Sequence, residues 1–166
     1  MIRARNPIEI VLIICSILLL PNTVKAGEII GGLKLGVVDL DASGFDPIST
    51  GTLQLGYEFV DLLAVDLAIE GDITRSLTDA DGPGGDYSYQ HAGLFGSIRS
   101  AGPIYVIARA GLVDVRVEQD AGSDSDSGTA YGLGLGFSTG IRFEIEWTTY
   151  EFEDSDVQQV SLHFAF

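Results

Sequence analysis

The sequence predicts an all-β protein, an eight-stranded antiparallel up-and-down transmembrane β-barrel. Three observations support this fold class. Hydrophobic residues make up 46% of the 166-residue chain although its formal net charge is −15, which indicates that apolar and acidic side chains occupy different zones. Beyond residue 26, apolar and polar residues alternate in segments close to the roughly 9–11 residues of a tilted membrane strand. The links between these segments are alternately short turns and longer polar loops, which is typical of membrane barrels.

The first part of the chain, residues 1–26, has the features of a cleaved secretory signal peptide. A basic start precedes an apolar core over residues 10–20, and Val24 and Ala26 place small residues before a cleavage point. The core is shorter than the roughly 20 residues that span a bilayer, and an uncleaved anchor is the alternative interpretation. The barrel domain is therefore expected over residues 27–166.

Cleavage after Ala26 changes the composition of the chain. The remaining residues hold 6 basic and 23 acidic side chains and no cysteine, because Cys15 is the only one. No disulfide or thiol chemistry is expected, and no cofactor is predicted. Nucleic acid is excluded as a partner because binding its phosphates needs a basic surface.

The predicted strands are recognised by their alternation. In the seventh, every second residue from Ile141 to Trp147 is apolar, and every intervening residue from Arg142 to Thr148 is polar. A helix would scatter these residues around its circumference, whereas a strand sorts them onto two faces. In chain order the predicted strands span residues 29–39, 49–59, 64–75, 87–99, 104–118, 129–138, 141–152 and 157–166.

Four other predicted strands show the same period of two. The second alternates over Leu53–Phe59 and the third over Val65–Ile69. The sixth sets the large residues of Tyr131–Phe137 against glycines, and the eighth alternates over Val160–Phe166. Each of these segments therefore has one apolar face and one polar or small face.

The links between predicted strands differ in length and charge. Those after the second, fourth and sixth strands are short, whereas those after the first, third and fifth are longer and rich in Asp, Gly and Ser; the link after the seventh is short but polar. This alternation predicts short periplasmic turns and acidic extracellular loops, with both termini on the periplasmic side. In that order, the links are Val60–Leu63, Ser100–Pro103 and Thr139–Gly140, then Leu40–Ile48, Ser76–Asp86 and Gln119–Gly128, then Glu153–Asp156.

The face opposite the apolar one decides between a membrane barrel and a soluble one. It carries charges together with glycines, including Gly132, Gly134 and Gly136. An eight-stranded barrel has little interior space, so small residues are needed opposite large ones. We therefore expect the charges inside as a network of ion pairs, because a buried unpaired charge is costly. The predicted network comprises Lys34, Glu58, Asp66, Glu70, Arg99, Arg109, Arg142, Glu144 and Glu146.

The end of the chain resembles the C-terminal signal that the outer-membrane assembly machinery reads in its barrel substrates. Val160, Leu162, Phe164 and the terminal Phe166 alternate, and Gln158 departs from the pattern. Over residues 27–166 the chain also resembles the small OmpA/OmpX-like, opacity-type, porin-like outer-membrane β-barrel family. That resemblance is carried by Gly51-x-Leu53-x-Leu55-Gly56-Tyr57, Gly102-Pro103-Ile104-Tyr105 and Arg109-x-Gly111.

The family resemblance implies a place in the outer membrane of a Gram-negative cell envelope. The expected partners are outer-membrane lipid, lipopolysaccharide and the assembly machinery. Aromatic residues near strand ends are candidates for the girdles at the two membrane interfaces. They are Tyr57, Phe59, Tyr87, Tyr89, Tyr105, Trp147, Tyr150 and Phe152.

No catalytic or metal site is predicted. Barrels of the deacylase type pair His with Ser two residues later, but Gly93 follows His91 and Ala165 follows His163 at that spacing. The acidic loops contain only fragments of a calcium-binding loop, which needs six positions and a distal Glu. We therefore predict a non-enzymatic structural or surface-interaction role. A narrow channel for small solutes or ions, and a soluble periplasmic ligand-binding barrel, are the alternatives.

Overall fold

The computed structural model describes residues 27–40, 43–62, 65–83, 85–119, 122–138, 141–153 and 155–166. The predicted signal peptide, residues 1–26, lies outside the described residues. No helix of the described part is long and apolar enough to cross a membrane. The strands are β1 (Glu28–Leu40), β2 (Ile48–Leu62), β3 (Val65–Ser76), β4 (Ala80–Gly82), β5 (Gly85–Ser100), β6 (Ile104–Gln119), β7 (Gly122–Ser138), β8 (Arg142–Glu151) and β9 (Asp156–Ala165).

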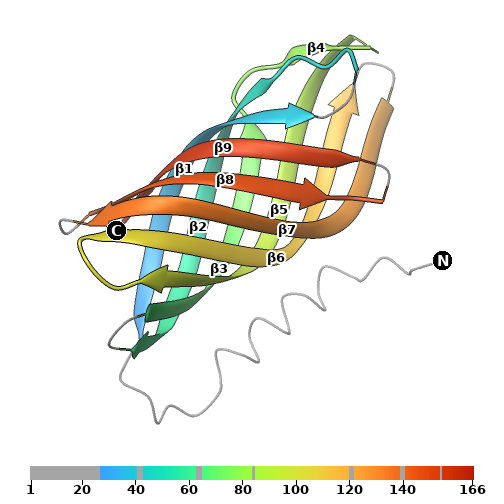
Figure 1. Cartoon of the computed structure of the whole chain (residues 1–166). Coiled ribbons are helices and arrows are strands. Elements are labelled where there is room, and N and C mark those ends of the chain that lie inside the picture. The colour runs from blue at the N-terminus through green and yellow to red at the C-terminus, as the bar shows by residue number, and fades with distance from the viewer. Residues whose placement is uncertain are drawn as a thin grey trace.

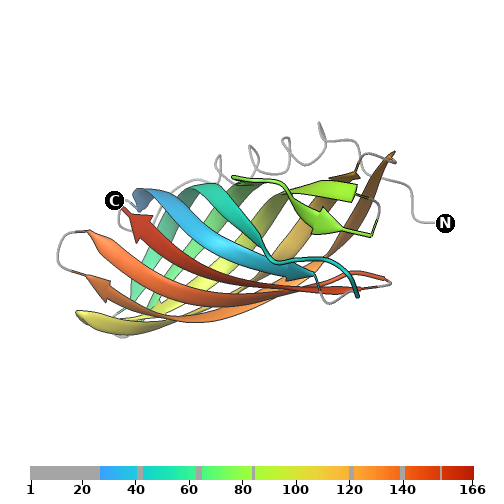
Figure 2. The same cartoon turned by 90° about the horizontal axis from the view of Figure 1, so that it is seen from above.

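The strands close into a single barrel (Figures 1 and 2). Each pairs antiparallel with its neighbour, β9 returns to pair with β1, and β3 pairs with β5. The ring therefore has eight strands, because β4 pairs only with the first residues of β5 and continues the line of β3 along it. The predicted eight-stranded antiparallel barrel is confirmed.

The closing seam joins the first and last strands. The register runs from Gly32↔Ala165 to Leu40↔Val157. Beyond it, Gly31 and Phe166 exchange two backbone hydrogen bonds, of 3.0 and 2.8 Å. Closure satisfies the backbone groups that an open sheet would leave exposed at its edges, which a strand in hydrocarbon requires. The C-terminus lies at the end of the barrel opposite β4 (Figure 1).

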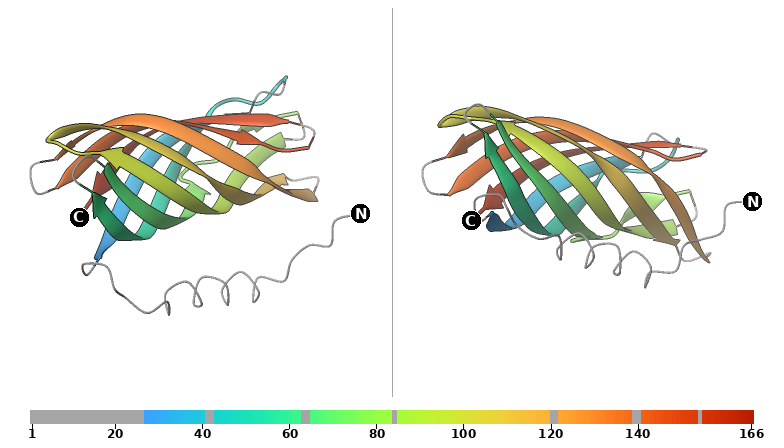
Figure 3. Two further views of the ribbon diagram at one scale, coloured as in Figure 1. Left: turned by 60° about the horizontal axis from the view of Figure 1, so that its bottom comes forward. Right: turned by 90° about the horizontal axis from the view of Figure 1, so that it is seen from below.

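Two predicted loops contain strand. Ser76–Asp86 includes β4 and the first residues of β5. The segment Gln119–Gly128 is strand for most of its length, because β6 and β7 stay in register from Ile104↔Phe137 to Gln119↔Gly122. The outer part of β7 contains no alternating apolar residues, so it carries no strand signal of its own. It is strand because the paired β6 supplies its ladder. The β6–β7 ladder therefore continues beyond the last pair that joins β7 to β8, Thr129↔Glu151. Figure 3 shows β5, β6 and β7 running obliquely along the tube to this end.

The two faces of the barrel wall are divided as predicted. Leu133 and Ile145 on the outer face are 65% and 61% exposed, whereas Gly132 and Glu144 beside them on the inner face are buried. Outward side chains in the central part of each strand are apolar or small, and polar ones follow only towards the strand ends. A band of this kind fits contact with hydrocarbon.

Interior glycines provide space for large inward side chains. A Cβ on Gly136 would lie 2.2 Å from the Tyr105 ring, and one on Gly32 would lie 2.2 Å from His163 Nε2. Any larger residue at either position would displace this inward side chain of the adjacent strand. The predicted complementarity of small and large interior residues is present at these positions.

Half of the predicted interfacial aromatics lie inside the barrel. Tyr87, Tyr89, Tyr105 and Tyr150 are at most 5% exposed. Trp147, by contrast, is 59% exposed on the outer face. The assignment of the four tyrosines to a girdle is therefore wrong, because nearness to a strand end does not specify which face a residue occupies. The register does, and it turns them into the lumen, where hydroxyl groups find polar partners.

The outer band gives a first prediction. Leu133→Arg places a charge near the middle of the apolar band and should destabilise the folded barrel in lipid bilayers by about 2–4 kcal/mol. Ser123→Arg, at the exposed outer tip of β7, is the matched control and should change stability little. Urea titration in lipid vesicles, followed by the fluorescence of Trp147, measures both. Equal effects of the two variants would contradict a lipid-facing band.

Candidate functional site: the charged interior

A cluster of charged side chains fills the middle of the lumen. It is contributed by five of the eight wall strands, each placing its charges at inward positions of the period-two pattern. All members are at most 4% exposed. They are Lys34 on β1, Glu70 and Asp72 on β3, Arg99 on β5, Arg109 on β6, and Glu144 and Glu146 on β8.

Arg109 connects two walls of the cluster. Its guanidinium donates to Asp72 at 2.5 Å and to Glu146 at 3.3 Å. β3 and β8 are not neighbours of β6, so these contacts cross the lumen. The guanidinium carbon also lies 3.6 Å from the centroid of the Phe95 ring, a cation–π contact in a desolvated place.

Arg99 forms the second centre. It donates through Nε to Glu144 at 2.8 Å and lies 2.7 Å from Glu70. Glu144 also accepts from the Tyr105 hydroxyl at 2.8 Å, and Glu70 accepts from Ser97 at 2.9 Å. Both carboxylates are thus satisfied by several donors, which is the condition under which buried ion pairs are tolerated.

Lys34 completes the cationic set. Its ammonium group lies 3.1 Å from Glu146 and 3.6 Å from Asp72. Arg109 approaches the same two carboxylates, so each is shared by two cations. Such sharing distributes charge around the lumen and links β1, β3, β6 and β8.

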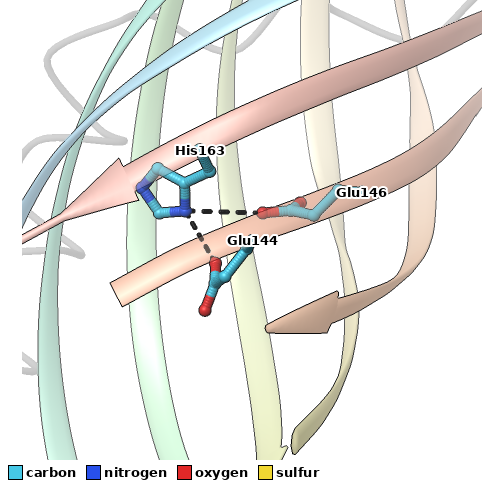
Figure 4. A group of neighbouring side chains, drawn as sticks. All are labelled: Glu144, Glu146 and His163. Atoms are coloured by element: carbon cyan, nitrogen blue, oxygen red, sulfur yellow. Dashed lines mark hydrogen bonds and ion pairs between the residues drawn. The ribbon is translucent and has the colours of Figure 1, made fainter. Parts of the chain in front are cut away.

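His163 on β9 joins the same cluster (Figure 4). Its Nδ1 lies 2.6 Å from Glu144 and 3.6 Å from Glu146. The ligand atoms of these three residues fall within 4.8 Å of one another, a spacing compatible with a metal ion. However, the carboxylates are already engaged by Arg99, Arg109 and Lys34. The arrangement is therefore that of an ion-pair network, and we assign no metal to it.

The remaining predicted network residues lie nearer the end of the barrel that holds the C-terminus. Arg142 donates to Glu58 at 2.9 Å across the lumen, and the arginine is half-buried. Asp66 lines a polar pocket of about 90 Å³ together with Arg99, Tyr105 and Arg142. All nine residues predicted for the interior therefore face the lumen or its mouth. Ion pairs join Lys34 and Arg109 to Glu146, Arg99 to Glu70 and Glu144, and Arg142 to Glu58.

Two cluster members were not predicted. Asp72 has the same parity along β3 as Glu70, so the alternation already placed it on the inner face. His163 lies opposite Leu162 and Phe164 in the alternating end of the chain. Their sequence positions carried the signal for the face, but nothing in the sequence showed that they sit at the height of Arg109 and Glu144.

A layer of neutral hydrogen bonds lies outward of the charges. Thr52 and Thr74 are 2.7 Å apart, and Thr74 contacts His91 Nε2 at 3.0 Å. His91 Nδ1 in turn contacts the Tyr89 hydroxyl at 3.0 Å. A second chain joins Tyr150 to Gln159 and then to Thr50. Both histidines are thus held in the lumen by local partners, away from the lipid face where a lipid substrate would lie.

An apolar plug overlaps this layer and fills the outer end of the lumen. Tyr87 donates its hydroxyl to the backbone oxygen of Asp46 at 2.6 Å, and Phe45 packs edge-on against the Tyr87 ring. The segment between β1 and β2 is thereby fixed over the buried cluster. The buried members of the apolar plug are Val38, Ile48, Tyr87, Tyr89, Phe95, Val113, Val115, Ala130, Tyr150 and Val157.

Solved structures share this architecture. Ail, the attachment invasion locus protein of Yersinia pestis, in complex with sucrose octasulfate, superposes with a TM-score of 0.58 at 17% identity, over 84% of this chain and 97% of that one. OprG from Pseudomonas aeruginosa gives 0.57 at 14% identity, over 86% and 97% of the two chains. The chain therefore has the fold of a small outer-membrane β-barrel. The outer membrane enzyme PagL is similar as well, with a TM-score of 0.52 at 15% identity over 81% and 98%.

Comparison by sequence adds nothing further: no family model and no curated protein matches the chain. The likeness consequently lies in the architecture. The similar structures include an enzyme as well as surface proteins, so the fold by itself does not specify a role.

The network yields a second prediction. Arg109→Leu leaves Asp72 and Glu146 with a missing buried partner and should lower the free energy of unfolding by about 3–5 kcal/mol. Arg116→Leu, on the same strand, removes an exposed pair with Glu118 and should cost less than about 1 kcal/mol. Urea unfolding in detergent micelles compares the two. Similar losses would show that the interior pairs do not hold the walls together.

Proposed function

We propose that the protein is an outer-membrane barrel with a non-enzymatic surface-interaction role. This role is carried by its acidic outer extension, which comprises the loops and strand ends at the end of the barrel that holds β4. The observation that supports this most directly is the separation of charge along and across the wall. Cations are concentrated in the lumen, where they neutralise buried carboxylates, and the part beyond the apolar band is left acidic.

The distribution of the six basic residues after residue 26 makes the point. Lys34, Arg99, Arg109 and Arg142 lie in the lumen. The other two, Arg75 and Arg116, are exposed near the outer ends of β3 and β6. Exposed acids of the described outer part far exceed these two cations. They include Asp39, Asp46, Asp79, Asp81, Asp86, Asp114, Glu118, Asp124, Asp126, Glu151, Glu153 and Asp156.

The chemistry of this surface restricts its partners. A carboxylate-rich surface attracts groups of positive charge and repels phosphates and nucleic acid. In an outer membrane the extension would stand beside lipopolysaccharide phosphates, which would need divalent cations between the two anionic groups. The apolar band would contact lipid. A partner at the extension is therefore expected to carry positive charge.

The interior favours a structural part over transport. Side chains from opposite walls meet in the charged layer, the neutral layer and the apolar plug. A barrel of eight strands is filled by such side chains. We propose that the lumen serves as the barrel's core.

Tag accessibility tests the location and the orientation together. An epitope tag inserted between Gln119 and Gly122 should bind antibody on intact cells, since it would sit at the outer tip of the β6–β7 hairpin. A tag inserted after Ala101, in the short turn between β5 and β6, is the control and should bind only after permeabilisation. Cell fractionation and heat-modifiable gel migration accompany the assay. Soluble periplasmic protein, or the reverse pattern of accessibility, would defeat the proposal.

The C-terminal pattern is proposed to act as the assembly signal, through Val160, Leu162, Phe164 and Phe166. The Phe166 side chain is 76% exposed while its backbone bonds to Gly31, so Phe166→Ala should keep the seam and remove only the ring. We expect less heat-modifiable barrel in the outer-membrane fraction of cells. Phe137→Ala, an exposed aromatic on β7, is the matched control. Undiminished assembly of the Phe166 variant would rule out this role.

A further inference from the structure

Among the described residues, the part of β7 beyond the end of β8 has a strand neighbour on one side only. The register of β7 with β8 ends at Thr129↔Glu151, whereas its register with β6 continues to Gly122. On the side away from β6, no described residue is in register with the segment Gly122–Gly128. Residues 122–127 are all exposed. An exposed edge of this kind is a template on which another strand can pair.

The backbone N–H groups of Ser125 and Ser127 face this open side. Successive N–H groups along a strand point alternately to its two sides. Ser138 donates its N–H to Pro103, on the β6 side of β7, and the β6–β7 register contains no bulge between these positions. Ser125 and Ser127 lie an odd number of residues away from Ser138, so their N–H groups point away from β6.

Both of these N–H groups are already occupied. Ser125 donates to the Asp124 carboxylate at 2.9 Å, and Ser127 donates to the Asp126 carboxylate at 2.7 Å. Each aspartate thus covers the donor that an added strand would need, and it places a negative charge beside it. The alternating Ser-Asp sequence repeats this arrangement along the edge, two residues apart.

We propose that Asp124 and Asp126 close the free edge of β7 against strand addition by a second copy of this chain. The second copy is the relevant partner because it carries the same open edge, so two copies can present identical unpaired strands to each other. The side-chain oxygens block strand addition because they accept hydrogen bonds from the edge N–H groups. This inference stands apart from the proposed surface role, since it concerns the backbone of β7 and not the partner of the acidic surface.

Two paired variants separate the hydrogen-bond role from charge. Asp124→Thr with Asp126→Thr removes both carboxylate acceptors and suits a strand; the hydroxyl oxygen that replaces each one lies one bond nearer the backbone than the Oδ atom did. Asp124→Asn with Asp126→Asn removes the same two charges but keeps an amide oxygen in the place of the acceptor. Light scattering coupled to size-exclusion chromatography of the protein in detergent micelles gives the mass of each, after heat-modifiable migration has verified folding.

We expect the Thr pair to associate at concentrations at which the wild type and the Asn pair stay monomeric. Amide hydrogen exchange supplies a readout within the monomer: at low concentration, Ser125 and Ser127 should exchange at least about tenfold faster in the Thr pair, because their carboxylate acceptors are gone. A folded Thr pair that remains monomeric overturns the proposal. Association of the Asn pair to the same extent also overturns it, because charge alone would then guard the edge.

Discussion

The cross-lumen ion pairs are the interaction on which the rest of the structure depends. Closing eight strands leaves a narrow interior. Because many apolar side chains point outward in the apolar band, an apolar core does not fill the interior at every level. Arg99 and Arg109 reach acids on strands two or three positions away around the ring. Each pair removes a charge that would be costly alone and at the same time ties one wall to another.

This arrangement assigns a different task to each zone of the lumen. Charged groups occupy the middle, neutral hydrogen bonds follow, and an apolar plug with Phe45 and Tyr87 finishes the outer end. Because four of the six basic residues after residue 26 are used in the lumen, few are left to balance the acids outside. The acidity of the outer extension is thus linked to the demand for cations in the interior.

The part of the β6–β7 hairpin that extends beyond β8 loses the advantage of a closed sheet, in which no strand edge is left open. Within the band every strand has two neighbours, whereas the β6–β7 hairpin continues after β8 has ended. The resulting edge lies in water, so its backbone groups tolerate exposure but can recruit another strand. The serine and aspartate residues there give little reason to expect a strand from sequence, yet they suit an edge that must stay unpaired.

Alternation in the sequence determined which residues share a face, because the side-chain period of a strand is two. Segment 141–148 was sorted correctly for this reason, and the eight-stranded ring followed from the number of such segments. Only the tertiary structure decided how high each side chain lies along the barrel axis and which residue it pairs with. Register and ring closure pair Arg99 with Glu144 and bring Asp72 and His163 into the cluster. They also turn Tyr87 and Tyr150 inward and continue β7 to Gly122. Those are non-local constraints, and no local period encodes them.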